Sequence, residues 1–509
     1  MLAIVPLPTS MTPAEGHFTL DSKTAFHASG AATPVARLIA QDLRVPTGLT
    51  LRVTANKATK AVTFTIKADK ELGDEGYRLR VRPEGVQVTA QTAAGLFYGG
   101  QTLRQLLPAE AFGKAKASGV KWQMPSVDIV DVPRFRWRGL MLDVARHFMP
   151  KEEIIKFVDL LALHKMNSLH LHLTEDQGWR IEIKRYPKLT EVGAWRKETV
   201  IGTNSGKYDG KRHGGFYTQK ELKEIVKYAA ARYVNIVPEI EMPGHAQAAI
   251  AAYPELGNLK ERLEVWQMWG VNPNVFNVEE KTVKFLQNVL DEVMQVFPSK
   301  FIHVGGDECP KDQWKASPRV QELIKQRGTK DEHGMQSWFI KQMDTYLAGK
   351  GRRLLGWDEI LEGGLAPGAT VMSWRGMEGG ITAAKAGHDV VMAPTDTTYF
   401  DYYQAKPTEK EPYAIGGYVP LEKVYNFDPV PSTFTAAQAK HVLGTQGQLW
   451  SEYIATPEHL EYMAFPRACA LAEVAWTPMA RKNFNEFSGR LAEHLKRFDQ
   501  VGVHYRKLN

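Results

Sequence analysis

Residues 301–308 read FIHVGGDE, and this stretch indicates both a fold and the position of a site. The apolar run is typical of a buried parallel strand, the two glycines allow the backbone to approach another group closely, and Asp307 and Glu308 follow at its end. Neighbouring carboxylates repel each other, and burial raises the pKa of an acid, which suits proton transfer near neutral pH. The two acids also fit the first turn of a helix, so the flanking sequence must decide.

Seven other short apolar stretches after residue 138 resemble this one. They are GLMLDVAR (139–146), SLHLHLTE (168–175), NIVPEIEM (235–242), RLLGWDEI (353–360), TVMSWRG (370–376), VVMAPTD (390–396) and VLGTQGQLW (442–450). Helical spacing separates most of them, as at 151–165, 218–233 and 283–297. Eight strand–helix units predict a (β/α)8 TIM barrel. A doubly wound open sheet is the alternative, but no glycine-rich phosphate turn follows any strand.

The first 132 residues have a different pattern. Apolar and polar residues alternate at 18–22, 61–68, 76–90 and 124–133, which is typical of half-exposed strands, and residues 33–48 and 92–108 have helical spacing. We therefore expect a small α+β domain at 1–132, and a barrel domain with a C-terminal helical segment at 133–509.

Composition excludes several classes of protein. A net charge of +7 is spread over 509 residues without a basic stripe, so we expect no nucleic-acid partner. No apolar run is long enough for a membrane span, so we expect no membrane partner. Cys309 and Cys469 give neither a disulfide framework nor a metal-type spacing. The compartment stays open: periplasmic or secreted if a leader has been removed, otherwise cytoplasmic.

Acids, tryptophans and a few other polar side chains gather at the predicted strand ends, where a barrel of this type forms its site. In chain order they are Arg138, Asp143, Asp176, Glu239, Glu241, His245, Asp307, Glu308, Trp357, Asp358, Glu359, Trp374, Tyr399, Asp401, Trp450 and Glu452. Carboxylates bind hydroxyls and protonate a glycosidic oxygen, while indoles stack on the apolar face of a pyranose. This combination predicts a sugar site. Two long connections, 196–218 and 401–433, follow strands and are expected to reach it.

Several of these residues also have a structural interpretation. Asp143 is either a ligand-binding acid or a partner for Arg146. Arg138 is either a substrate clamp or the partner of a carboxylate. Glu239 and Glu241 lie on one face of a strand, where an inward ionic layer competes with a role in the site.

The HLH sequence raises the alternative of a metal-dependent hydrolase. His170 and His172 share one face of a strand, and with His245 and Asp307 they would make a ligand set. Against this, acids and indoles at the mouth far outnumber the histidines. Core-facing imidazoles bonded to carboxylates are the competing interpretation, and we expect no metal and no cofactor.

Five motifs together resemble glycoside hydrolase family 20, the β-N-acetylhexosaminidases. They are RGLMLDVARHF (138–148), NSLHLHLTEDQGWRIEIKRYPKL (167–189), EIEMPGHA (239–246), HVGGDECP (303–310) and GQLWSE (447–452). The resemblance covers about 138–476, and the leading α+β module is similar to the small domain that precedes the barrel in this family. It implies an exo-acting enzyme whose partner is a small carbohydrate with a terminal β-linked N-acetylhexosamine.

The resemblance also assigns roles. Glu308 would be the general acid/base, Asp307 would hold the 2-acetamido group, and Tyr399 would bond its carbonyl oxygen. The indoles that would wall the pocket are those of Trp357, Trp374 and Trp450. The residues that would bind sugar hydroxyls are Arg138, Asp401 and Glu452. Asp176 and His245 would support the acid. One departure from the family pattern is Glu175, which stands where an aspartate is more usual.

The adjacency of the two acids constrains the mechanism. Consecutive side chains diverge, so Asp307 and Glu308 do not easily straddle a glycosidic bond as the usual retaining pair does. In the family, the acetamido oxygen of the substrate is the nucleophile and an oxazolinium intermediate gives retention. The alternative to an enzyme is a catalytically silent relative that only binds carbohydrate. Such a protein would keep the tryptophans but need not keep the acids.

Overall fold

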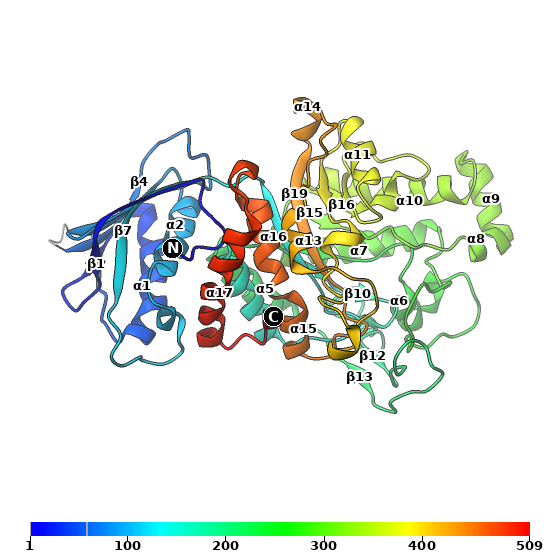
Figure 1. Cartoon of the computed structure of the whole chain (residues 1–509). Coiled ribbons are helices and arrows are strands. Elements are labelled where there is room, and N and C mark those ends of the chain that lie inside the picture. The colour runs from blue at the N-terminus through cyan, green and yellow to red at the C-terminus, as the bar shows by residue number, and fades with distance from the viewer. Residues whose placement is uncertain (1, 57–59, 509) are drawn as a thin grey trace.

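The computed structural model describes residues 2–56 and 60–508 and divides into a small N-terminal sheet domain and a larger barrel (Figure 1). The C-terminal helices α16 (Arg467–Trp476) and α17 (Phe484–Val501) lie between the two parts. Within the described residues, no helix has the length and apolar character needed to cross a bilayer.

The N-terminal part is a mixed sheet with two long helices. In sheet order its strands, within the described residues, are β1 (Ser10–Thr19), β7 (Gln123–Asp131), β5 (Tyr77–Arg82), β6 (Gly85–Ala90), β4 (Ala61–Ile66), β2 (Ala25–His27) and β3 (Val53–Thr54). Helices α1 (Thr33–Thr47) and α2 (Ala93–Gln105) pack against each other and against the sheet. The alternation seen in the sequence is the burial pattern of these strands, because each has one face on the helices.

The rest of the chain closes into a parallel barrel, which confirms the predicted fold class. Its strands are β8 (Trp137–Asp143), β9 (Ser168–His172), β14 (Asn235–Glu239), β15 (Phe301–His303), β16 (Arg353–Trp357), β17 (Thr370–Ser373), β18 (Val390–Met392) and β19 (Val442–Leu449). Each of the eight predicted strands overlaps one of them, and only β8 begins outside its predicted stretch, at Trp137 rather than at 139. Most of their residues are buried, because helices cover the outside and side chains fill the inside.

Helices separate most of the barrel strands. The long ones are α3 (Lys151–Leu163), α5 (Gln219–Ala230), α7 (Glu280–Val296), α9 (Pro318–Arg327) and α10 (Glu332–Gly349). The shorter ones are α4 (Lys188–Glu191), α6 (Gln247–Ala252), α8 (Asp312–Ala316), α11 (Glu378–Lys385), α12 (Thr395–Thr398), α13 (Leu421–Asn426), α14 (Ala436–Ala439) and α15 (Pro457–Ala464). Short paired strands, β10 (Thr174–Glu175) with β11 (Gly178–Trp179) and β12 (Trp195–Arg196) with β13 (His213–Gly214), extend the loops after β9.

The opening octapeptide leaves the strand early. Strand β15 ends at His303, and α8 begins only at Asp312, so Asp307 and Glu308 lie on a loop between them. The helix-cap interpretation of the two acids is therefore wrong. The loop lies at the carboxyl end of the barrel, where its side chains meet those of the other strand ends.

Candidate active site

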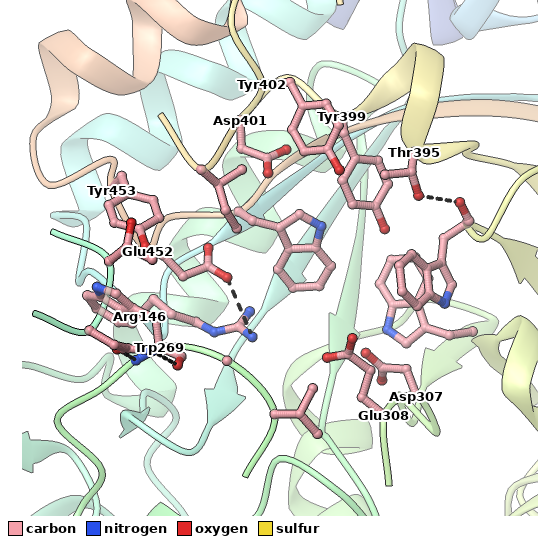
Figure 2. Close-up of a pocket in the computed structure, with 18 residues that line it drawn as sticks. Arg146, Trp269, Asp307, Glu308, Thr395, Tyr399, Asp401, Tyr402, Glu452 and Tyr453 are labelled. Atoms are coloured by element: carbon pink, nitrogen blue, oxygen red, sulfur yellow. Dashed lines mark hydrogen bonds and ion pairs between the residues drawn. The ribbon is translucent and has the colours of Figure 1, made fainter. Parts of the chain in front are cut away.

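A pocket of about 320 Å³ opens at the carboxyl ends of the barrel strands (Figure 2). The predicted site residues that line it are Asp307, Glu308, Trp357, Trp374, Tyr399, Asp401, Trp450 and Glu452. Both long connections reach it as predicted, through Thr203 and Asn204 of the first and Tyr402 and Ile415 of the second. A space of this size suits one small ligand.

The glycines before the acidic doublet are required by close packing. Gly305 has φ 67°, and a Cβ on it would lie 1.7 Å from a carboxylate oxygen of Glu241. Gly306 has φ 98°, and its Cβ would lie 2.6 Å from Ile360. The sequence therefore predicted the close approach correctly. Glu308 itself has φ 40°, a conformation that non-glycine residues rarely adopt and that often marks a functional position.

His245 links the doublet to a second pair of acids. Its Nε2 lies 3.6 Å from Oδ2 of Asp307 and 3.5 Å from Oε2 of Glu308. Its Nδ1 lies 2.7 Å from Oε1 of Glu175 and 3.4 Å from Oδ2 of Asp176. Burial lowers the pKa of His245, but these carboxylates outweigh burial and raise it well above its usual value. An imidazolium therefore lies directly behind the two candidate catalytic acids.

The two acids of the doublet have different electrostatic environments. Burial raises the pKa of Asp307 to about 6, although His245 opposes the shift. The side chain of Glu308 is 38% exposed, and its hydrogen bond to His245 lowers its pKa. The prediction that burial raises the pKa of at least one acid is confirmed for Asp307. At neutral pH both are mainly ionised until a ligand covers Glu308.

Glu241 is a buried carboxyl whose surroundings favour the protonated form. Neither of its carboxylate oxygens has a hydrogen-bond partner among the described residues. Burial raises its pKa well above the usual value, and the charges of Asp307 and Glu239 raise it further. Protonation of Glu241 would limit the negative charge that collects beside Asp307 at the base of the pocket.

An aromatic cage forms one side of the pocket. The rings of Trp374 and Tyr399 stack with centroids 6.2 Å apart, and those of Trp357 and Trp450 lie 5.6 Å apart. Buried carboxylates fix two of the indoles. Nε1 of Trp357 donates to Glu239 at 2.8 Å, and Nε1 of Trp374 donates to Glu359, also at 2.8 Å. The cage is therefore rigid, and its faces are apolar surfaces on which a methyl group or sugar face can pack.

Charged groups gather at the opposite side of the pocket (Figure 2). Arg146 lies 3.0 Å from Glu175, 3.3 Å from Asp143 and 4.0 Å from Glu452. Asp143 is therefore the structural partner of Arg146, and its other oxygen accepts from backbone N–H groups of 145 and 146. Burial, followed by the charge of Glu452, raises the pKa of Asp401 well above its usual value. Donors and acceptors in this arrangement suit hydroxyl groups.

Arg138 was predicted to bind substrate, and its position contradicts that prediction. It is the second residue of β8, at the amino end of the barrel, and its side chain is fully buried. Its guanidinium donates to both oxygens of Glu75 at 2.8 Å and to the carbonyl oxygens of Phe135 and Lys165. The carboxylate-partner interpretation is thus correct, and the pair connects the small domain to the barrel. The arginine that lines the pocket is instead Arg146, which follows the carboxyl end of β8.

Replacing Arg138 by leucine should therefore affect stability and not substrate binding. Glu75 would be left without its main partner in a largely buried place, so we expect about 3 kcal/mol less free energy of unfolding. Urea denaturation measures this loss, and KM for a small glycoside should stay within twofold. Arg146→Leu is the matched control and should raise KM. A large rise in KM for Arg138→Leu at unchanged stability would return Arg138 to the pocket.

The HLH pair contacts a carboxylate inside the barrel. Nδ1 of His172 lies 2.5 Å from Oε2 of Glu239, and Nε2 of His170 lies 3.0 Å from the same oxygen. Nδ1 of His303 approaches the other oxygen of Glu239 at 2.8 Å. His170 and His172 are therefore core-facing imidazoles that contact a carboxylate. Glu239, which they share with His303, belongs to an inward ionic layer.

Sequence reasoning missed part of the pocket wall. Trp269 and Tyr453 line it but were not predicted. Trp269 lies in an irregular segment between α6 and α7, where no strand end marked it. Tyr453 directly follows Glu452, and its place beside a predicted site residue was the only available signal.

Fold and site together define a glycoside hydrolase of the barrel type. Residues 135–479 match the profile of glycosyl hydrolase family 20, catalytic domain, and residues 1–132 match that of domain 2 of the same family. The chain belongs to glycosyl hydrolase family 20. The family suggested by the five sequence motifs is thus confirmed.

Individual relatives agree with this assignment. A β-hexosaminidase of Porphyromonas gingivalis is 46% identical over 99% of this chain, which spans 64% of that protein's length. A β-N-acetylhexosaminidase of Cellulomonas fimi is 31% identical over 99% of this chain and 96% of its own. The solved structure of the GH20 β-N-acetylhexosaminidase of Streptomyces coelicolor A3(2) superposes with a TM-score of 0.86 at 32% identity, covering 100% of this chain and 98% of that one.

Proposed function

We propose that the protein is a retaining exo-β-N-acetylhexosaminidase. It removes terminal N-acetylglucosamine or N-acetylgalactosamine from β-linked glycans or chitooligosaccharides. The observation that carries this proposal is the doublet itself: Asp307 is buried beside the aromatic cage, while Glu308, the next residue, is partly exposed at the pocket. Relatives support the substrate class, since one from Vibrio harveyi is an N,N'-diacetylchitobiase and one from Streptomyces plicatus has been solved with the product GlcNAc.

In the first step the acetamido oxygen of the substrate attacks the anomeric carbon. Asp307 accepts a hydrogen bond from the amide N–H and stabilises the positive charge that develops on the oxazolinium ring. The Tyr399 hydroxyl donates to the acetamido oxygen and orients it. The indoles of Trp357 and Trp374 surround the acetamido methyl group, which excludes water from the forming ring.

Glu308 transfers the proton in both steps. A bound sugar covers its carboxyl, which raises the pKa and allows protonation before the glycosidic bond breaks. The proton then moves to the leaving oxygen, and the resulting carboxylate later takes a proton from the water that opens the oxazolinium ring. His245, held by Glu175 and Asp176, compensates the negative charge that Glu308 carries after it has protonated the leaving oxygen.

The far end of the sugar meets the charged groups of the pocket. We assign binding of the C3, C4 and C6 hydroxyls to Arg146, Asp401 and Glu452, and stacking on the sugar face to Trp450. We also propose that the chain divides into domains at 1–132 and 133–509, a division supported by the end of β7 at Asp131 and the start of β8 at Trp137.

The ionisation of Asp307 should appear in the pH profile. With a p-nitrophenyl leaving group, acid assistance is hardly needed, so kcat/KM reports mainly on Asp307. Its pKa is raised to about 6, so the carboxylate form is present above pH 6 and is lost as the pH falls. We expect kcat/KM to decrease about tenfold per pH unit below 6. A profile that stays flat down to pH 4 would contradict this assignment.

Turnover of p-nitrophenyl N-acetyl-β-glucosaminide, followed by NMR of the first-formed anomer, tests the proposed function. The β-anomer is expected. A silent carbohydrate-binding relative would give no turnover, and an inverting enzyme would give the α-anomer first.

A further inference from the structure

Three hydroxyl side chains from three different loops meet at one end of the pocket, where Thr203 and Tyr453 line the pocket and Tyr413 contacts both from outside the lining. Thr203 belongs to connection 196–218, Tyr413 to connection 401–433, and Tyr453 follows β19. Oγ1 of Thr203 lies 2.5 Å from the hydroxyl of Tyr413. The rings of Tyr413 and Tyr453 pack edge to face with centroids 4.9 Å apart. We call these three residues the Thr203 cluster.

Neighbouring contacts fix the cluster in place. The Asn204 amide donates to the carbonyl oxygen of Trp269 at 2.8 Å and accepts from its backbone N–H at 3.1 Å. The Trp269 ring lies 6.3 Å from that of Tyr453 and under the guanidinium of Arg196. The two long connections and the segment after β19 are thus joined into one wall, although each alone is an irregular loop. A wall braced from three sides moves less than a free loop.

The position of this wall relative to the acids identifies the sugar atom that it faces. Tyr453 and Trp269 lie on the same side of the pocket as Arg146 and Glu452, across from Asp307 and Glu308 (Figure 2). In a pyranose, C1 and C4 are opposite corners of the ring. A sugar whose C1 is at Glu308 therefore has C4 directed at the wall. This step rests on the proposed function.

We propose that the Thr203 cluster determines specificity at C4 of the bound sugar. It closes the pocket beyond an equatorial C4 hydroxyl that Arg146 and Glu452 bind. An axial C4 hydroxyl leaves the mean plane of the ring and loses part of these contacts, and the rigid wall prevents the sugar from shifting to regain them. The gluco configuration is therefore preferred over the galacto configuration because the wall is fixed, and loosening the wall weakens the preference.

The test is the ratio of kcat/KM for p-nitrophenyl N-acetyl-β-glucosaminide to that for the galactosaminide. Thr203→Val keeps the shape and removes the hydroxyl, while Tyr413→Ala removes the ring. We expect a wild-type ratio above one and about a three- to tenfold lower ratio in Thr203→Val, with a larger decrease in Tyr413→Ala. Tyr208→Phe is the matched control, because Tyr208 is an exposed tyrosine of the same connection, and its ratio should stay within twofold of wild type.

Different outcomes would contradict the inference on C4 and the proposed function. A ratio that stays within twofold of wild type in both cluster variants, while both rates fall together, would overturn the inference and leave the proposed function intact. A wild-type protein that hydrolyses neither glycoside would overturn the proposed function and the inference with it.

Discussion

Replacing Glu308 by glutamine is expected to lower kcat/KM on chitobiose by about a thousandfold, because glutamine cannot protonate the leaving oxygen of a sugar. The loss should be much smaller on p-nitrophenyl N-acetyl-β-glucosaminide, whose phenolate leaves without assistance. Glu308 is partly exposed and its main partner is His245, so the variant should fold normally. Steady-state kinetics on both substrates, with circular dichroism as the folding check, measures the difference.

The matched control is Glu362→Gln, the same chemical change at an exposed glutamate that pairs with Arg375 outside the lining of the pocket. It should retain wild-type rates on both substrates. Near-wild-type hydrolysis of chitobiose by Glu308→Gln would show that another group is the acid.

Removing the acetamido group from the substrate should have an equally large effect. A p-nitrophenyl β-glucoside carries no internal nucleophile, and an internal nucleophile in the correct position is equivalent to a very high effective concentration. We expect kcat/KM on the glucoside to be at least about 10⁴-fold lower than on the N-acetylglucosaminide. The comparison isolates the acetamido group, because both substrates have the same leaving group and ring configuration.

Asp307→Ala provides the complementary variant. It should lower the rate on the N-acetylglucosaminide strongly and leave the residual rate on the glucoside unchanged, because Asp307 acts only on the amide. Efficient turnover of the glucoside by the wild-type protein would indicate an enzymic carboxylate nucleophile instead.

Much of the fold was predictable because the barrel strands are buried on both faces. Such strands appear in sequence as short continuous apolar runs, and all eight were found, although strand β15 ends at His303 rather than at the acids. The strand ends also located the tryptophans and Tyr399. Arg138 precedes the predicted strand 139–146, at the end opposite to the site, so its assignment as a hydroxyl-binding residue rested on the family resemblance and not on the strand ends. Arg138 lies inside β8 near its amino end and Arg146 follows its carboxyl end, and only Arg146 lines the pocket.

The other gaps in the prediction have a different cause. Trp269 and the Thr203 cluster lie on irregular segments, where side-chain positions depend on contacts between loops distant in sequence. The raised pKa of Glu241 depends on its burial and on acids from other strand ends. Local sequence patterns contain no information on contacts between distant loops or on the pKa of Glu241. The two glycines of FIHVGGDE did signal a close approach, but the group they approach could not be identified from the sequence.

The central claim is that the substrate supplies its own nucleophile, oriented by Asp307. Its most direct test is the rate on p-nitrophenyl glucosaminides whose N-acetyl methyl carries zero, one, two or three fluorines. Fluorine withdraws electrons from the acetamido oxygen without changing the leaving group. We predict that log kcat/KM falls steeply and steadily with each fluorine. A rate independent of fluorination would contradict the account, because it would mean that the acetamido oxygen does not attack the anomeric carbon.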